Sequence, residues 1–145
     1  MKFLFKKICI SSDHAGFKLK ENIKDFLIKK NLSIIDLGPA NENSVDYPDY
    51  ARKVSNRVKS KKSEIGILVC GSGTGMAISA NKTKKIRAAV CYNLKSTRLC
   101  RQHNNANIIA LGSRLIKKDN ALKLISVFLQ TEFEGGRHLR RVKKI

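Results

Sequence analysis

The chain has 145 residues and carries 30 lysine and arginine residues against 11 aspartate and glutamate residues, for a formal net charge of +19 at pH 7. This length suits one domain with its own core, and we expect residues 1–145 to form it because no stretch has the composition of a linker. The basic residues lie in scattered pairs and aromatic residues make up only 6% of the chain, which argues against nucleic-acid binding as the main function.

The sequence also argues against membrane, secreted and zinc proteins. No window approaches the roughly 20 apolar residues of a membrane span. The apolar stretch at residues 3–5 is too short for a signal peptide, and lysines follow it at once. The four cysteines show neither Cys-x-x-Cys spacing nor a neighbouring histidine pair. We therefore expect a cytoplasmic protein with reduced thiols, no bound metal ion and no contact with a membrane.

Short apolar runs alternate along the chain with segments of helical periodicity, a pattern typical of a parallel sheet covered on both faces. The predicted strands are residues 7–11, 33–37, 65–70, 87–91 and 107–111. Apolar stripes predict three of the helices: Phe17, Ile23, Phe26 and Leu27; Tyr50, Val54 and Val58; and Ala121, Leu122, Ile125, Phe128 and Leu129. Helices after the third and fourth strands complete the alternation. We expect an α/β fold, a single-domain Rossmann-like three-layer α/β/α structure with a five-stranded parallel sheet.

The third predicted strand ends on Cys70 and runs into the loop Gly71-Ser72-Gly73-Thr74-Gly75, after which a helix is expected from Met76. Such a turn aims several backbone N–H groups at one point, which suits an anion. A thiol at the start of a helix is favoured in its thiolate form. A reactive cysteine beside an oxyanion cradle would follow, although strand-end cysteines are often small core residues, and these residues alone leave both roles open.

The glycine loop departs from the nucleotide-binding motifs. Its glycines read G-x-G-x-G, with Met76 where the dinucleotide fingerprint has its third glycine, and no P-loop lysine and hydroxyl pair follows. Bound NAD or ATP is therefore disfavoured, and we expect no cofactor.

Polar residues follow all five predicted strands, and working residues of open parallel sheets collect at the carboxyl ends of the strands. These residues are Asp13-His14, Asp46-Tyr47-Pro48, Cys70, Tyr92-Asn93 and Gly112-Ser113-Arg114. Each has a structural alternative: a helix cap, a surface histidine, a turn or an ion pair with a helix end. Their joint placement on one edge favours a functional site.

The following motifs, in this order along nearly the whole chain, resemble the ribose-5-phosphate isomerase B family of sugar phosphate isomerases: Asp13-His14-Ala15-Gly16-Phe17, Asp46-Tyr47-Pro48, Cys70-Gly71-Ser72-Gly73-Thr74-Gly75, Ala80-Asn81-Lys82, Ile86-Arg87-Ala88, Arg101-Gln102-His103-Asn104 and Gly135-Gly136-Arg137-His138 through Arg141. The resemblance implies a cofactor-free aldose-ketose isomerase. It would interconvert ribose 5-phosphate and ribulose 5-phosphate through an enediolate, a step of the pentose phosphate pathway.

The resemblance also implies roles for individual residues. Cys70 would be the base that moves a proton between carbons 1 and 2. The N–H groups of Gly71, Gly73, Thr74 and Gly75 would hold the oxyanion, with the Ser72 hydroxyl nearby. His103, with Asp13 as a helper, would open the furanose ring; its alternative is a plain helix end.

The remaining implied contacts are with the sugar and the phosphate. Asn104 and Tyr47 would contact sugar hydroxyls. The phosphate would lie among His14, Arg114, Arg137 and Arg141, because arginine forks match a phosphate in charge and geometry. The alternative for the tail is a solvated basic helix, and Arg140 and Lys143 are candidates for plain surface residues.

Members of the resembled family are homodimers or dimers of dimers with sites built across the interface, so we expect the basic tail to reach a neighbouring subunit. Two other functions stay open at this stage. One is a galactose-6-phosphate or allose-6-phosphate isomerase of the same family, and the other, from a different class, is a basic nucleic-acid-binding protein.

Overall fold

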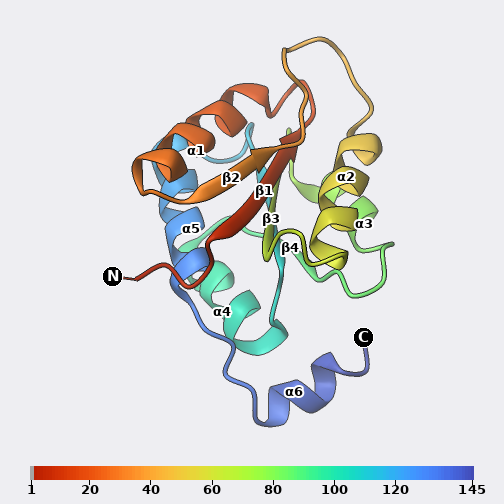
Figure 1. Ribbon diagram of the computed structural model, residues 1–145, viewed down its shortest axis with the longest axis vertical. Helices are drawn as coiled ribbons and strands as arrows, with labels where there is room; N and C mark the ends of the chain where they lie inside the picture. The colour runs from red at the N-terminus through yellow and green to blue at the C-terminus, as the bar shows by residue number, and fades with distance from the viewer. Residues whose placement is uncertain (1) are drawn as a thin grey trace.

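The computed structural model describes residues 2–145 and contains one sheet of five parallel strands (Figure 1). The strands are β1 (Lys7–Ser12), β2 (Ser33–Asp36), β3 (Ile65–Cys70), β4 (Ala88–Val90) and β5 (Ile108–Gly112). They lie in the order β2-β1-β3-β5-β4. Each strand begins and ends within one residue of its predicted bounds, and the expected three-layer α/β fold is confirmed. Among residues 2–145, no helix is long and apolar enough to span a bilayer.

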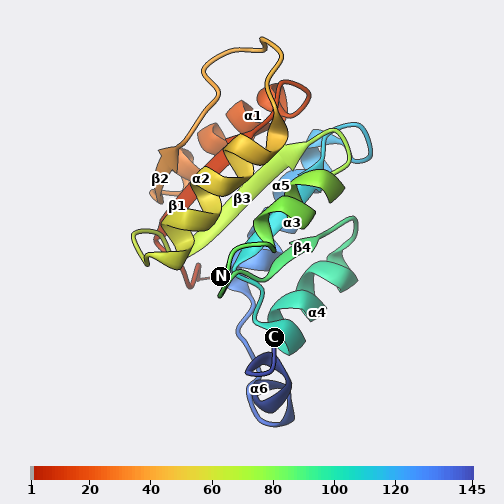
Figure 2. The same cartoon turned by 90° about the vertical axis from the view of Figure 1, so that its right-hand side faces the viewer.

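Helices cover both faces of the sheet (Figure 2). α2 (Tyr47–Lys59) and α3 (Thr74–Ala80) pack on one face, where they bury Leu68 and Ile108. α1 (Phe17–Lys29), α4 (Leu94–Asn104) and α5 (Lys118–Gln130) pack on the other face, around Ile67 and Val69. Successive residues of a strand point to opposite faces, and β3, covered on both, is buried at all six positions. This burial explains why it reads as a continuous apolar run.

The apolar stripe of α1 differs from the predicted one. Leu19, Ile23 and Leu27 are its buried apolar residues, whereas Phe17 and Phe26 are only half-buried at the margin of the core. In the same way, Tyr50 of α2 and Leu122 of α5 lie at the edge of their cores. Large apolar side chains at the margin of a buried helix face follow the helical period but do not lie at the centre of that face. The predicted stripe of α1 therefore includes residues at the edge of the buried face.

A last short helix, α6 (Arg137–Val142), lies outside the two layers of helices and projects from the end of the molecule where α4 terminates (Figure 1). The backbone N–H of Glu134 donates to the carbonyl of Gln102 at 3.0 Å, which ties the segment before α6 to the last turn of α4. The basic tail is therefore helical, as expected, and is anchored to α4 at its beginning.

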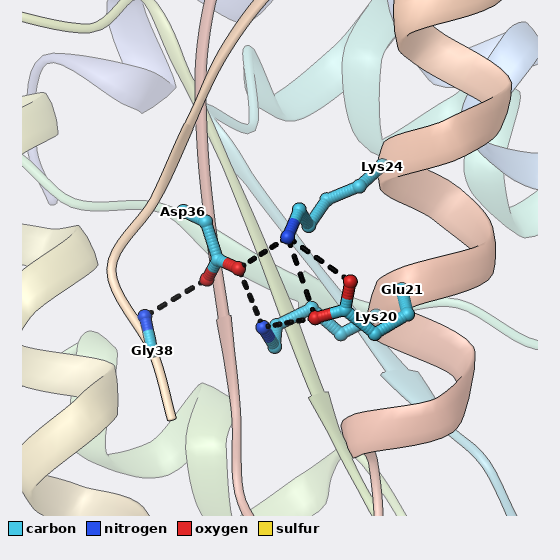
Figure 3. A network of polar contacts seen from close by, with 5 residues as sticks. All are labelled: Lys20, Glu21, Lys24, Asp36 and Gly38. Atoms are coloured by element: carbon cyan, nitrogen blue, oxygen red, sulfur yellow. Dashed lines mark hydrogen bonds and ion pairs between the residues drawn. The ribbon is translucent and has the colours of Figure 1, made fainter. Parts of the chain in front are cut away.

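A buried lysine joins α1 to the edge strand β2 (Figure 3). The Lys20 side chain is fully buried, and its Nζ lies 2.7 Å from Asp36 Oδ2 and 3.0 Å from Glu21 Oε1. Lys24 Nζ lies 2.6 Å from the same Asp36 oxygen, and the Gly38 N–H donates to the other oxygen at 2.9 Å. Burial by itself would raise the pKa of Asp36, but these hydrogen bonds outweigh it and hold the pKa below its ordinary value of 3.8.

We expect Lys20→Met to lower the free energy of unfolding by about 1–3 kcal/mol at pH 7. Methionine keeps the apolar stem, and Asp36 retains Lys24, so the loss stays below that of a fully unpaired buried charge. Because the pKa values of Asp36 and Glu21 are lowered by folding, their contribution is present above their ordinary values of 3.8 and 4.5 and is lost as the pH falls below them. The difference between wild type and variant should therefore shrink below about pH 4.

Urea denaturation at several pH values measures this effect. Lys18→Met is the matched control because the Lys18 side chain is 82% exposed on the same helix. Equal stability of Lys20→Met and wild type at pH 7, or a difference that stays constant down to pH 3, would contradict the assignment.

Candidate active site

The loop after β3 holds the thiol of Cys70 against a backbone donor. Gly73 has a φ of 79°, a left-handed conformation that favours glycine, and it turns the chain into α3 at Thr74. The helix thus begins two residues before the predicted Met76. The Gly73 N–H donates to Cys70 Sγ at 3.1 Å, so the loop places positive N–H density beside the sulfur.

An open pocket of about 400 Å³ at the carboxyl edge of the sheet contains this thiol. Cys70 itself is only 5% exposed. The pocket is lined by Asp13, Tyr47, Cys70, Gly71, Ser72, Gly75, Arg114 and Leu115. They come from the chain after β1, the start of α2, the loop after β3 and the chain after β5, as expected for the shared edge of parallel strands.

Close packing fixes the walls of the pocket. A Cβ on Gly75 would lie 2.6 Å from Cε1 of Tyr47, so only glycine lets this tyrosine lie against the loop. On the other side, the N–H of Ser113 donates to the Cys70 carbonyl at 2.8 Å, and the N–H of Arg114 donates to the Gly71 carbonyl at 3.0 Å. These bonds hold the segment that carries Arg114 beside the loop.

Asp13 and His14 each have a backbone partner. Asp13 Oδ1 accepts the Gly16 N–H at 2.9 Å, so this carboxylate stabilises the chain entering α1 while it also lines the pocket. His14 Nδ1 accepts the Val45 N–H at 3.3 Å, which leaves Nε2–H as the free donor of the ring. Asp13 is not the cap of α1, whose N-cap residue is Gly16 and has no side-chain cap. Its carboxylate instead holds the turn before the helix through Gly16 and borders the pocket.

Four of the predicted site residues lie at the opposite end of the molecule. α4 begins beyond β4 and runs back to the amino end of β5, so His103 and Asn104, in its last turn, lie at the amino edge of the sheet. Asn104 lines a different pocket, of about 370 Å³, together with Arg87 and Ala88. Arg137 and Arg141 lie on α6, which projects from this same end (Figure 1). One chain does not bring these four residues together with Cys70.

His103 has a partner that sequence reasoning did not select. Its ring stacks on that of His138, with centroids 4.2 Å apart and an angle of 12° between the rings. Burial lowers the pKa of His138, and the neighbouring His103, Arg137 and Arg141 lower it further, while Glu134 opposes them. His138 is visible in the sequence only as part of the Gly135-Gly136-Arg137-His138 motif. Its contact with His103 depends on how the tail folds back on α4, which no local pattern indicates.

The other three cysteines lie in the hydrophobic core. Cys9 is fully buried under α2, and burial raises the pKa of its thiol to about 11. Cys91 and Cys100 lie in the core on the other face of the sheet, with their sulfur atoms 3.8 Å apart. Among the four cysteines, Cys70 is the one that lines the pocket with Asp13 and Tyr47.

Comparisons with known proteins agree with one another. The chain matches the family model described as Ribose/Galactose Isomerase over residues 8–145. It is 47% identical to a putative sugar phosphate isomerase of Rickettsia bellii, with 95% of this chain and 96% of the relative covered. The solved structure of Clostridium thermocellum ribose-5-phosphate isomerase B is 50% identical, with a TM-score of 0.94 and coverage of 95% of this chain and 93% of that chain. The structure of Mycoplasma genitalium ribose-5-phosphate isomerase B with bound ribulose-5-phosphate is 42% identical, with a TM-score of 0.91 and coverage of 94% and 91%.

Proposed function

Because the chain belongs to the ribose/galactose isomerase family, we propose that it is an aldose-ketose isomerase that interconverts ribose 5-phosphate and ribulose 5-phosphate. The observation that carries this proposal is the position of Cys70, whose sulfur accepts a backbone N–H inside a pocket bordered by Asp13, Tyr47 and Arg114. The pocket is thus bordered by a base, the Cys70 thiolate, by backbone N–H donors of the loop, and by the cationic side chain of Arg114.

The chemistry follows from this arrangement. The Cys70 thiolate takes the proton from carbon 2 of open-chain ribose 5-phosphate, and the electron pair forms the carbon 1 to carbon 2 double bond of an enediolate. The proton of the carbon 2 hydroxyl passes to the negative oxygen on carbon 1, the carbon 2 carbonyl forms as the double bond opens, and the thiol returns its proton to carbon 1, which gives the ketose. N–H groups of Gly71, Gly73, Thr74 and Gly75, with the Ser72 hydroxyl, stabilise the negative oxygen. Electrons move only within the substrate, so the reaction needs no cofactor.

Ring opening and phosphate binding need residues that lie, within one chain, at the opposite end of the molecule from Cys70. We place Cys70, Asp13, His14, Tyr47 and Arg114 in each site from one subunit. His103 and Asn104 on α4, with Arg137 and Arg141 on α6, come from a second copy of the chain. His103, helped by Asp13, moves the proton between the ring oxygen and the anomeric hydroxyl. Asn104 and Tyr47 contact the sugar hydroxyls. The arginines and His14 surround the phosphate.

Exposed apolar side chains support such a dimer. Leu115 at the rim of the Cys70 pocket is 58% exposed, and Ile78 on neighbouring α3 is 60% exposed. Leu139, between Arg137 and Arg141 on α6, is 41% exposed. Apolar residues beside both halves of the site are what an interface between copies would cover. We propose a homodimer or a dimer of dimers, with residues 1–145 acting as one isomerase domain in the cytoplasm.

An assay of the purified protein with ribose 5-phosphate, allose 6-phosphate and galactose 6-phosphate tests the function. We expect the highest kcat/KM with ribose 5-phosphate, and we expect it to persist in the presence of a chelator. A preference for either hexose phosphate would support the hexose isomerase alternative. Absence of isomerisation together with salt-dependent DNA binding would support the nucleic-acid alternative and contradict the proposal.

A further inference from the structure

Three potential metal ligands meet where the tail folds back on α4. His103 lies in the last turn of α4, Glu134 in the segment before α6, and His138 in the first turn of α6. One ligand atom from each side chain can be chosen so that the three lie within 4.8 Å of one another. His138 Nε2 and Glu134 Oε2 are already 3.6 Å apart.

The backbone holds this cluster in place. The Glu134 N–H donates to the carbonyl of Gln102, the residue beside His103, at 3.0 Å. The His138 N–H donates to the Gly135 carbonyl at 3.0 Å, and His138 is only 9% exposed. Glu134 and His138 thus belong to one short segment, and that segment is hydrogen-bonded to the end of α4, which carries His103.

The donor set selects a class of ion. Two imidazoles and one carboxylate suit Zn²⁺, Ni²⁺ and related first-row ions, whereas Mg²⁺ and Ca²⁺ prefer oxygen ligands. Ligands about 2.1 Å from a tetrahedral zinc ion stand roughly 3.4 Å apart. The two stacked rings must therefore tilt so that their nitrogen atoms converge. Glu134 is exposed and His103 half-buried, so both side chains have room to move.

We propose that His103, Glu134 and His138 form a binding site for a divalent transition-metal ion such as Zn²⁺, and that the bound ion inhibits the enzyme. A neutral imidazole has one ring nitrogen with a free lone pair. When the ion takes that lone pair on His103, the ring has no base left with which to open the furanose. The inhibition rests on the proposed function, whereas the binding site does not.

Histidine NMR with Zn²⁺ tests the site directly, because the chain contains only three histidines. We expect one ion per chain to shift the ring signals of His103 and His138 and to leave those of His14 unchanged. Glu134→Gln should weaken binding at least about tenfold, since losing even an outer-shell partner of a metal site costs roughly 10- to 100-fold. Glu132→Gln is the matched control, because Glu132 is an exposed carboxylate in the same segment and lies outside the cluster.

Unshifted signals of His103 and His138, or equal Zn²⁺ affinity of Glu134→Gln and wild type, would overturn the site. The inhibitory role is tested separately by measuring isomerase activity. Zn²⁺ should slow the conversion of ribose 5-phosphate, and a chelator should restore the rate. The Glu134→Gln variant should require at least about ten times more Zn²⁺ for the same inhibition. Binding seen by NMR without inhibition would overturn the inhibitory role. Absence of isomerase activity in the metal-free protein would count against the proposed function and leave the NMR result to decide the site.

Discussion

Replacing Cys70 with alanine lowers kcat by about 10²- to 10⁴-fold, the usual contribution of a positioned general base. The Cys70 sulfur accepts the backbone N–H of Gly73, and Cys70 lines the pocket in which the reacting carbons are placed. The substitution removes one sulfur atom from Cys70, which is 5% exposed, and leaves the other residues of the pocket in place, so the fold and the binding of ribose 5-phosphate should remain. A coupled isomerase assay, calorimetric titration and circular dichroism measure the three properties.

Cys9→Ala and Cys100→Ala are the controls. Both thiols are buried away from the Cys70 pocket, so each change should reduce the free energy of unfolding by about 1 kcal/mol and leave turnover close to normal. Near-normal activity of Cys70→Ala, with the fold intact, would exclude Cys70 as the base.

Replacing Arg141 with alanine raises KM for ribose 5-phosphate roughly 10- to 150-fold, since a hydrogen bond to a charged group is worth about 1.5–3 kcal/mol. Arg137 and Arg141 are exposed and four residues apart on α6, so their side chains lie on one face of the helix. Arg140→Ala is the matched control, because it removes the same charge from the adjacent position and should leave KM within about twofold. Equal KM values for the two variants would mean that the tail is only a solvated basic helix.

The sequence predicted the sheet well because its strands are either buried apolar runs or short runs between clear turn residues. It also predicted which residues meet at the carboxyl edge, since Asp13, Tyr47, Cys70 and Arg114 each follow a strand end or begin the next helix. That inference needs only the rule that parallel strands end at the same edge.

What depends on long-range packing could not be predicted. Nothing in the sequence distinguishes Lys20 from the many other lysines of the chain, yet it is fully buried because Asp36 and Glu21 neutralise its charge. The stacking of His103 on His138 depends on the path of the tail. The family resemblance put His103 in one site with Cys70, whereas α4, a crossover helix between parallel strands, carries it to the opposite end of its own chain.

If each site is built from two copies of the chain, co-refolding of Cys70→Ala with Arg141→Ala rebuilds intact sites from two damaged variants. In a homodimer of either variant both sites are damaged. In a hybrid, one site combines the intact thiol of one chain with the intact arginine of the other, while the second site lacks both. Random mixing of two-fold dimers makes half of them hybrids, so we expect recovery of about a quarter of wild-type activity. No recovery beyond that of the separate variants, with hybrid dimers confirmed by mass spectrometry, would mean that Cys70 and Arg141 serve the same site from one chain and would contradict the shared site.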